Sequence, residues 1–393
     1  MITNNIASQF HTGHRVLPHF IKKGPHKQLF VVLAVIILST ACVHLVEQKP
    51  GLGAVIAWSE INGWAEDDHA QAWPGLRHNC SRAALSAVWQ ELCTEIALIS
   101  EPDNDIARAF FETHFVAREL LAENGDEGLI TGYYEPLLKG SLTRQDNFRY
   151  PIYRRPPDLI KVNLGELYPE LNGQPVRGRL VNNEIVPYFS RKDIDNGRAR
   201  LGGLEIAWVD NAIDVFFLHI QGSGRIRLED GREIVVGYAD QNGHPYESIG
   251  GSLIRRGAME PEQVSMDSIK DWLQQNPVDA SDVLYGNSSY IFFEQRDAAK
   301  PGPIGSYNVP LTAERSIAVD RRYIELGSPV WLDTTLPIEN TPYRRLMLAQ
   351  DTGGAIKGVV RADVFFGRGQ LARERAGMMK QPGRLYVLVP AAR

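Results

Sequence analysis

Two aspartates near the C-terminus are the residues whose types and spacing most favour chemistry. Asp351 follows the apolar run 346–349, Asp363 precedes the apolar run 364–366, and a turn with two glycines lies between them. A carboxylate beside a buried strand is unfavourable unless it is hydrogen-bonded or paired. We therefore predict an active-site rim at this point. The alternative for Asp351 is that it caps the glycine turn, because Asp often satisfies turn backbone.

Cleavage of a glycan is the chemistry that two such carboxylates would serve. A proton must reach the bridging oxygen, and a carboxylic acid with a raised pKa can deliver it. Asp363 is followed closely by Phe365 and Phe366. Burial beside these rings and the like charge of Asp351 would both raise its pKa. A hydrolase needs a second carboxylate for water or a nucleophile, whereas one acid that later acts as base suffices if the substrate's own hydroxyl attacks.

Other chemistries find less support in the sequence. Ser223 lies in Gly-Ser-Gly rather than in a Gly-x-Ser-x-Gly elbow, so a serine nucleophile is disfavoured. His219 and His244 have no partner at the usual spacing of a zinc site, and no metal is expected. The remaining carboxylates and aromatic residues suit a sugar polymer, because sugar rings stack on aromatic faces.

The chain totals limit the classes of protein further. With 393 residues and 44% hydrophobic composition, two domains with a sizeable core are expected. The formal net charge is -5, so no basic excess supports nucleic-acid binding, and we exclude it.

The N-terminus predicts export from the cytoplasm. Lys22, Lys23 and Lys27 precede the uncharged run 29–38, which is followed by small residues and Cys42. This layout is typical of a secretory signal, and because it ends at a cysteine it resembles a bacterial lipoprotein signal. We expect residues 1–42 to be signal or anchor, with Cys42 lipidated, and residues 43–63 to be a tether. The residue after Cys42 is not Asp, which favours the periplasmic face of the outer membrane; an uncleaved inner-membrane anchor facing the periplasm is the alternative.

Cys80 and Cys93 would then lie in a compartment where a disulfide persists. A bridge and two free thiols both remain open at this stage.

Hydrophobic periodicity predicts a mainly β protein with helices. Residues 71–124 have helical spacing, with one apolar stripe at Leu85, Val88, Trp89 and Leu92 and another at Ala109, Phe110, Phe115, Leu120 and Leu121. A second helical region spans 247–276, and long loops are expected at 154–157 and 166–179. The predicted strands are 130–134, 151–153, 206–209, 215–220, 226–228, 234–236, 290–293, 317–319, 330–332, 346–349, 364–366 and 385–389. Many short strands favour a closed or sandwiched β structure over a doubly wound parallel sheet.

Several motifs between Thr131 and Pro390 resemble those of the membrane-bound lytic murein transglycosylase A family. They are Gly132-Tyr-Tyr-Glu-Pro136, Pro151-Ile-Tyr-Arg154, His219-Ile-Gln-Gly-Ser-Gly224, Tyr238-Ala-Asp-Gln-Asn-Gly-His-Pro-Tyr246, Ser289-Tyr-Ile-Phe-Phe293, Ser316-Ile-Ala-Val-Asp320, Asp351-Thr-Gly-Gly-Ala-Ile-Lys357 and Arg361-Ala-Asp363. The resemblance implies an α+β fold in which a double-psi β-barrel domain, 64–136 and 238–390, carries an inserted smaller β domain, 137–237. The glycan strand would lie in a groove between the two domains.

The resemblance also implies roles for individual residues. Asp363 would be the acid and base, and Asp351 its supporting neighbour that holds the proton and orientation. Asp320, the third aspartate of a C-terminal three-aspartate domain, would be structural. The substrate-binding positions implied are Thr131, Tyr133, Gln221 and Ser223.

The implied activity is non-hydrolytic cleavage of the β-1,4 bond between N-acetylmuramic acid and N-acetylglucosamine in peptidoglycan, with formation of a 1,6-anhydro ring. This reaction requires no cofactor. The expected partners are glycan strands and, through the anchor, outer-membrane lipid. A hydrolase that uses the same cleft and a non-catalytic wall-binding lipoprotein are the alternatives.

Overall fold

The computed structural model describes residues 50–82, 86–171, 176–298 and 302–391. The predicted signal with Cys42 and the first part of the predicted tether lie outside these residues. Within the described ranges, no helix has the length and apolar character needed to cross a membrane.

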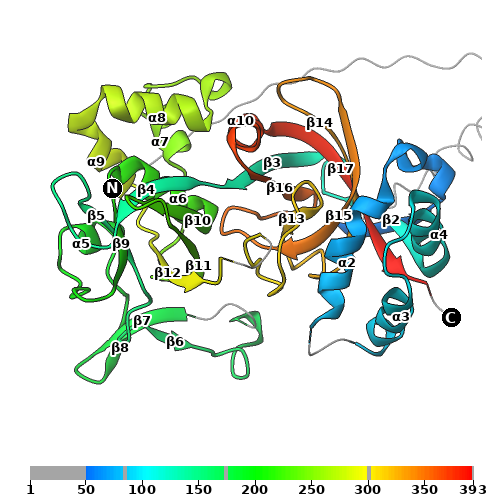
Figure 1. Cartoon of the computed structure of the whole chain (residues 1–393), viewed down its shortest axis with the longest axis horizontal. Helices are drawn as coiled ribbons and strands as arrows, with labels where there is room; N and C mark the ends of the chain where they lie inside the picture. Colours follow the sequence, from blue (N-terminus) through cyan, green and yellow to red (C-terminus); the bar gives the residue numbers. More distant parts are fainter. Residues whose placement is uncertain (1–49, 83–85, 172–175, 299–301, 392–393) are drawn as a thin grey trace, which may run out of the picture. The chain divides into compact units, whose positions relative to one another are not determined.

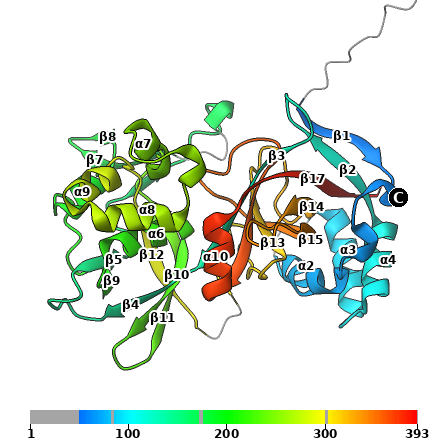
Figure 2. The ribbon, with the colours of Figure 1, turned by 90° about the horizontal axis from the view of Figure 1, so that it is seen from above.

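The largest sheet contains eight strands and closes on itself. Its order is β1 (Gly51–Ile56), β2 (Phe115–Leu121), β17 (Lys380–Pro390), β14 (Pro329–Thr335), β15 (Pro342–Asp351), β13 (Ser316–Val319), β16 (Arg361–Arg368) and β3 (Gly128–Glu135). A further pairing joins β17 to β3, so the strands from β17 to β3 form a closed barrel (Figure 1), and β2 and β1 lie beside it (Figure 2). The predicted α+β class with a β-barrel is confirmed.

Strand β13 lies between β15 and β16, the two strands that carry Asp351 and Asp363. All four of its residues are buried, and it pairs in parallel with β15 and antiparallel with β16. Its neighbour β15 ends at Asp351, and its neighbour β16 carries Asp363 as its third residue. The strand therefore sets the distance between them.

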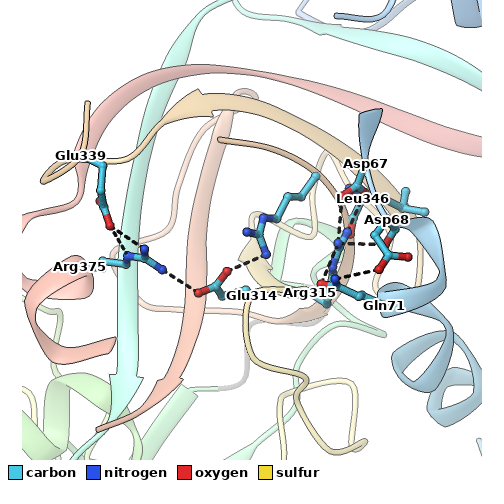
Figure 3. Close-up of polar contacts among 9 residues, drawn as sticks. Asp67, Asp68, Gln71, Glu314, Arg315, Glu339, Leu346 and Arg375 are labelled. Atoms are coloured by element: carbon cyan, nitrogen blue, oxygen red, sulfur yellow. Dashed lines mark hydrogen bonds and ion pairs between the residues drawn. The ribbon is translucent and has the colours of Figure 1, made fainter. Parts of the chain in front are cut away.

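Ion pairs attach the residues just before β13 to two other parts of the chain (Figure 3). Arg315, just before the strand, donates from Nη1 to Asp67 Oδ2 at 2.7 Å and from Nη2 to Asp67 Oδ1 at 2.9 Å. Both side chains are almost completely buried. The preceding Glu314 binds Arg375 of α10 (Gln370–Met378) at 2.9 Å. The segment around Asp67 and the helix α10 are thus both attached to the start of β13.

The N-terminal helices are α2 (Trp73–Cys80), α3 (Ala87–Leu98) and α4 (Asn104–His114). The structure joins α2 to α3 by a disulfide between Cys80 and Cys93, with the sulfur atoms 2.03 Å apart, which decides the question that the sequence left open. Short 3₁₀ helices precede and interrupt the larger elements at Trp58–Glu60, Trp64–Glu66, His69–Ala72, Pro169–Leu171 and Pro261–Gln263.

Three local predictions for the N-terminal part are wrong. Phe115, Leu120 and Leu121 lie in strand β2 and not in a helix, because β1 and β17 pair with this segment on its two sides. Val88 is 48% exposed and is not a core residue, whereas Leu85 lies outside the described residues. The second half of the predicted tether contains β1, which belongs to the barrel sheet.

A second sheet of six strands follows β3. Its order is β12 (Ile291–Arg296), β11 (Glu233–Gln241), β10 (Ser223–Leu228), β4 (Leu137–Ser141), β9 (Glu205–Val209) and β5 (Tyr150–Tyr153). A separate three-stranded sheet consists of β6 (Ile160–Val162), β7 (Val176–Val181) and β8 (Glu184–Val186). The boundary expected at residue 237 falls inside β11, and the inserted sheet continues to Arg296.

Two predictions for the inserted part are also wrong. The run 215–220 belongs to helix α6 (Ala212–Gln221), which is buried on most sides, and a short apolar run of that kind cannot be told from a strand by periodicity. The loop expected at 166–179 includes the first half of β7.

The remaining helices are α5 (Arg191–Asp195), α7 (Ile249–Arg255), α8 (Met266–Gln275) and α9 (Pro277–Tyr285). Among the barrel's own helices, α10 packs against β3 and β16 (Figure 2).

Candidate active site

Strand pairing brings Asp351 and Asp363 to the same place. Ala318 of β13 is the register partner of Asp351 on β15 and of Asp363 on β16. Residues paired across neighbouring strands point to the same face of a sheet, and neighbouring strands lie about 4.8 Å apart. The two carboxyl groups therefore flank one small residue on a common face. Alanine at this position leaves the space between them open.

Asp363 is oriented by a hydroxyl group from the next strand. Thr131 of β3 is its register partner on the other side, and Thr131 Oγ1 donates to Asp363 Oδ1 at 2.6 Å. Arg361 Nη2 donates in turn to Thr131 Oγ1 at 2.9 Å. A guanidinium group, a hydroxyl group and the carboxyl group thus form a chain. It places a positive charge one hydroxyl away from Asp363.

Asp351 has a full set of donors. Its Oδ2 accepts from the hydroxyl of Tyr133 at 2.9 Å. Its Oδ1 accepts from the backbone N–H of Thr352 and from both the N–H and the hydroxyl of Ser306, each at 2.9 Å. Hydrogen bonds of this kind favour the ionised form of a carboxyl group. These donors therefore oppose the rise in pKa that burial causes at Asp351.

The electrostatics separate the two carboxyl groups. Burial, the largest effect, raises the pKa of Asp363 to about 6; hydrogen bonding from Thr131 and the charge of Arg361 oppose this rise, and the charge of Asp351 adds to it. Burial also raises the pKa of Asp351, but the donors from Ser306, Thr352 and Tyr133 counteract the increase. Burial thus raises the pKa of both carboxyl groups, and Asp363, with a pKa of about 6, can carry a proton close to neutral pH. Both raising effects expected from the sequence are present.

The aromatic wall behind the pair is also fixed. The rings of Tyr133 and Phe365 lie 5.3 Å apart, and both side chains are buried. Burial and then the nearby carboxylates raise the pKa of Tyr133 well above its ordinary value, so its hydroxyl remains a donor. The apolar wall keeps water away from one side of Asp363. The Asp363 side chain is partly exposed to solvent on its opposite side.

Asp320 does not join the pair. Its carboxylate accepts from Arg322 at 3.0 Å and from the backbone N–H of Gly358 at 2.9 Å. Although burial works in the opposite direction, these hydrogen bonds lower the pKa of Asp320 to about 2. The residue is a permanent anion that attaches the loop between Asp351 and Asp363 to the end of β13. This is a structural position.

The other two predicted substrate-binding residues lie on the inserted domain, away from the carboxyl pair. Gln221 Oε1 accepts from the backbone N–H of Tyr134 on β3 at 2.9 Å. Ser223 begins β10 and is paired with Gly237 of β11. The structure therefore brings Thr131 and Tyr133 directly onto Asp363 and Asp351, whereas Gln221 supports the backbone further along β3.

Three residues at the site were missed from the sequence. Arg361 had a usable signal, because it precedes Asp363 by two residues on the same strand and therefore on the same face. Ser306 had none, since it lies in a loop 45 residues from Asp351. Tyr246 approaches from the segment after β11, and its Cβ lies 3.9 Å from the position that a Cβ atom on Gly354 would occupy. Burial raises the pKa of Tyr246, and the charge of Asp363 adds to this rise.

The two histidines considered from the sequence have structural contacts. His219 is buried and bonds to Arg191 through Nδ1 at 3.0 Å, and His244 Nε2 bonds to the carbonyl of Tyr188 at 2.8 Å. Within the described ranges, no three His, Cys, Asp or Glu side chains gather as metal ligands would.

Comparison with known proteins connects this geometry to a reaction. A family model described as the MltA specific insert domain matches residues 129–294, and one described as the 3D domain matches residues 315–389. A curated relative, "Membrane-bound lytic murein transglycosylase A" of Escherichia coli K12, is 35% identical over 278 residues, which are 69% of this chain and 68% of the relative. The chain spans 65% to 68% of the length of the curated relatives it matches.

Solved structures match over a larger share. A membrane-bound lytic murein transglycosylase from Agrobacterium tumefaciens has a TM-score of 0.76 and 34% identity, and the match covers 86% of this chain and 98% of that one. Escherichia coli MltA with bound chitohexaose has a TM-score of 0.66 and 28% identity, with 88% and 96% covered.

The barrel, the carboxyl pair and these matches define the class of protein as a peptidoglycan lytic transglycosylase. The chain belongs to the membrane-bound lytic murein transglycosylase A family. The resemblance stated from the sequence motifs is confirmed.

Proposed function

We propose that Asp363 is the acid and then the base of the transglycosylase reaction. In the first step its protonated carboxyl group gives a proton to the glycosidic oxygen between N-acetylmuramic acid and N-acetylglucosamine. The bond from the muramoyl C1 to that oxygen breaks, and the bonding electrons leave with the N-acetylglucosamine. Positive charge develops on C1 and the ring oxygen of the muramoyl residue.

In the second step the muramoyl 6-hydroxyl attacks C1 of the same residue. A bond forms between O6 and C1, and the carboxylate of Asp363 takes the proton from O6. The acid is regenerated, and the product is a 1,6-anhydro ring with no water consumed. A single group whose pKa lies close to the working pH can serve in both directions.

One observation carries this assignment, namely the contrast between the two carboxyl groups. The pKa of Asp363 is raised to about 6, chiefly by burial. Asp351 accepts three hydrogen bonds at one oxygen and one at the other. A carboxyl group whose pKa is raised towards the working pH is the usual arrangement for acid catalysis. The donors around Asp351 favour its ionised form, which would help to stabilise the positive charge that develops on the sugar.

The geometry supports a positioning role for Thr131 rather than for Asp351. The hydroxyl of Thr131, and not the carboxylate of Asp351, donates to Asp363. Because Asp363 Oδ1 accepts this hydrogen bond, Oδ2 is left as the oxygen that exchanges the proton with the substrate. Tyr133 acts similarly on Asp351.

We propose that the glycan strand lies along the barrel face that carries the two carboxyl groups, between the barrel and the inserted domain. The related structure with bound chitohexaose supports a β-1,4-linked sugar chain as the ligand. Tyr246, 37% exposed and close to Gly354, offers an aromatic surface for a sugar ring beside Asp363.

We also propose a lipid anchor at Cys42, on the periplasmic face of the outer membrane. The charged and apolar pattern before Cys42 and the name "membrane-bound" of the Escherichia coli relative support it. Mass spectrometry of the mature wild-type protein should find an acylated Cys42 at its N-terminus. A membrane-bound protein that still carries residues 1–41 would show that the anchor is an uncleaved helix instead.

Digestion of purified peptidoglycan tests the reaction. Mass spectrometry should find muropeptides lighter by one water than the products of a hydrolase, with no new reducing ends. Asp363→Ala should abolish turnover while binding to sacculi remains. An active Asp363→Ala variant, or reducing-end products from the wild type, would contradict the mechanism; retention of sacculi without any soluble product from the wild type would indicate a binding protein.

A further inference from the structure

A second pocket lies in the inserted domain, outside the site described above. Its volume is about 350 Å³, and its wall includes Arg179, Arg198 and Arg200, the carboxylate of Asp158, and the apolar side chains of Ile160 and Phe189. Three arginines and one aspartate therefore line the pocket. Such a lining attracts an anion with some apolar surface.

The donors of this pocket are incompletely used. Arg179 lies over the ring of Phe189 at 4.4 Å, and its Nε is buried without an acceptor among the described residues. Arg198 pairs with Asp193 at 2.9 Å, but its side chain is 74% exposed. Arg200 is exposed and makes no ion pair or side-chain hydrogen bond within the described part of the chain. Asp158 is already an acceptor for the hydroxyl of Tyr188 at 3.0 Å.

Because the Nε of Arg179 is buried, a ligand in the pocket would contact this side chain through its terminal Nη groups. Guanidinium groups bind carboxylates in a planar, two-point geometry that ammonium groups cannot reproduce. The stacked position of Arg179 on Phe189 limits the conformational freedom of its side chain. A carboxylate ligand would therefore meet a partly preorganised donor.

The wall of this pocket is connected to the active site by one short segment. Asn242 Nδ2 donates to the carbonyl of Phe189 at 2.9 Å, and His244 Nε2 bonds to the carbonyl of Tyr188 at 2.8 Å. Asn242 is almost completely buried, which fixes this attachment. Four residues further along the chain, Tyr246 reaches the neighbourhood of Asp363.

The segment from Asn242 to Tyr246 joins the attachment point at Phe189 to the neighbourhood of Asp363. Its four residues span at most about 14 Å when fully extended. In peptidoglycan, the muramoyl sugar carries a short peptide through its lactyl group, and this peptide ends in free carboxylates. A stem of three to five residues extends over roughly 10–18 Å. The reach of a stem is therefore comparable with the length of the segment that joins the pocket wall to the neighbourhood of Asp363.

We propose that the pocket formed by Arg179, Arg198 and Arg200 binds a carboxylate of the peptide stem attached to the muramoyl residue being cleaved. The proposal rests on the function proposed for Asp363. In this proposal the inserted domain recognises glycan strands that carry peptide stems. The apolar side chains of the pocket, Ile160 and Phe189, contact the aliphatic side chains of the stem. Peptide-free strands would use only the site on the barrel.

The experiment compares two substrates with one enzyme preparation. Peptide-bearing glycan strands and the same strands stripped by an amidase are digested, and the ratio of their kcat/KM values is measured. In Arg200→Ala this ratio should fall about tenfold, mainly through KM for the peptide-bearing strand, because one charge-assisted contact is lost. Arg179→Ala should act in the same direction. Using a ratio makes the result independent of the fraction of folded enzyme.

Arg232→Ala is the matched control. Arg232 is also an exposed arginine of the inserted domain, 69% exposed and paired with Asp230 on the hairpin between β10 and β11. Its ratio should equal that of the wild type. The proposal is overturned if the ratio is unchanged in both Arg200→Ala and Arg179→Ala, or if Arg232→Ala lowers it equally. Failure of the proposed function would look different, since the wild type would then form no anhydro product from stripped strands.

Discussion

The hydrogen bond between Thr131 and Asp363 gives the sharpest test of the catalytic assignment. Replacing Thr131 with Val keeps the shape of the side chain and removes the donor that lies 2.6 Å from Asp363 Oδ1. This donor favours the ionised carboxylate and so lowers its pKa. Thr131→Val should therefore raise the pKa of Asp363 above its value of about 6.

The magnitude follows from the type of bond. A hydrogen bond to a charged group contributes about 1.5–3 kcal/mol, and one pKa unit corresponds to about 1.4 kcal/mol. The pKa of Asp363 should rise by roughly one to two units. Because Asp363 must be protonated to begin the reaction, kcat/KM of the wild type should fall as the pH rises through about 6. In Thr131→Val this decline should move to about pH 7–8.

The assay is the pH profile of kcat/KM on soluble glycan strands, measured by release of anhydro products. Thr131→Ser retains the hydroxyl group and is the matched control, with a decline near that of the wild type. The reasoning is refuted if the valine variant shows no shift, or if the serine and valine variants shift equally. A downward shift would mean that Arg361, released from Thr131 Oγ1, acts directly on Asp363.

Three further predictions concern stability. Asp67→Ala leaves Arg315 buried without its partner and should lower the free energy of unfolding by about 3–5 kcal/mol in chemical denaturation; a loss below about 1 kcal/mol would show that the pair does not fix β13. Replacing Cys80 and Cys93 together by Ser removes a crosslink with a sequence separation of 13 and should cost about 3 kcal/mol without changing the anhydro product, so an altered product would contradict it. Asp363→Asn should stabilise the protein at pH 7 by up to about 3 kcal/mol, because the carboxyl group has a folded pKa of about 6 against an ordinary 3.8. That gain should develop between pH 4 and 6 and be absent at lower pH, where the wild-type carboxyl is protonated in both states; equal gains at pH 3 and pH 7 would contradict the assigned pKa.

Local sequence was sufficient for most strands but not for all elements. The barrel strands from β13 to β17 were predicted at nearly their observed places, since each alternates or is continuously apolar between turn residues. The runs 115–121 and 215–220 were assigned the wrong type of structure. The first is a strand because β1 and β17 supply partners from distant parts of the chain, and the second is a helix because its apolar residues are covered on most sides. Neither reason is visible in a short window of sequence.

The pocket on the inserted domain was also outside the reach of sequence patterns. Arg179 and Arg200 belong to unremarkable polar segments, and the expectation of a loop at 166–179 concealed strand β7. Only the packing of β7 beside Phe189 and the loop before Arg200 gathers these guanidinium groups.

By itself the sequence determined the family, the two aspartates and the apolar neighbours that raise the pKa of Asp363, because residue types and their order along the chain carry this information. Tertiary structure decided which groups surround the two aspartates. Ala318 lies between them only because β13 inserts between β15 and β16, and Thr131 reaches Asp363 across 232 residues of sequence. Strand neighbours in a closed barrel are chosen by the packing of the whole sheet. The partner of each carboxyl group, and hence which of them holds the proton, is a property of that packing.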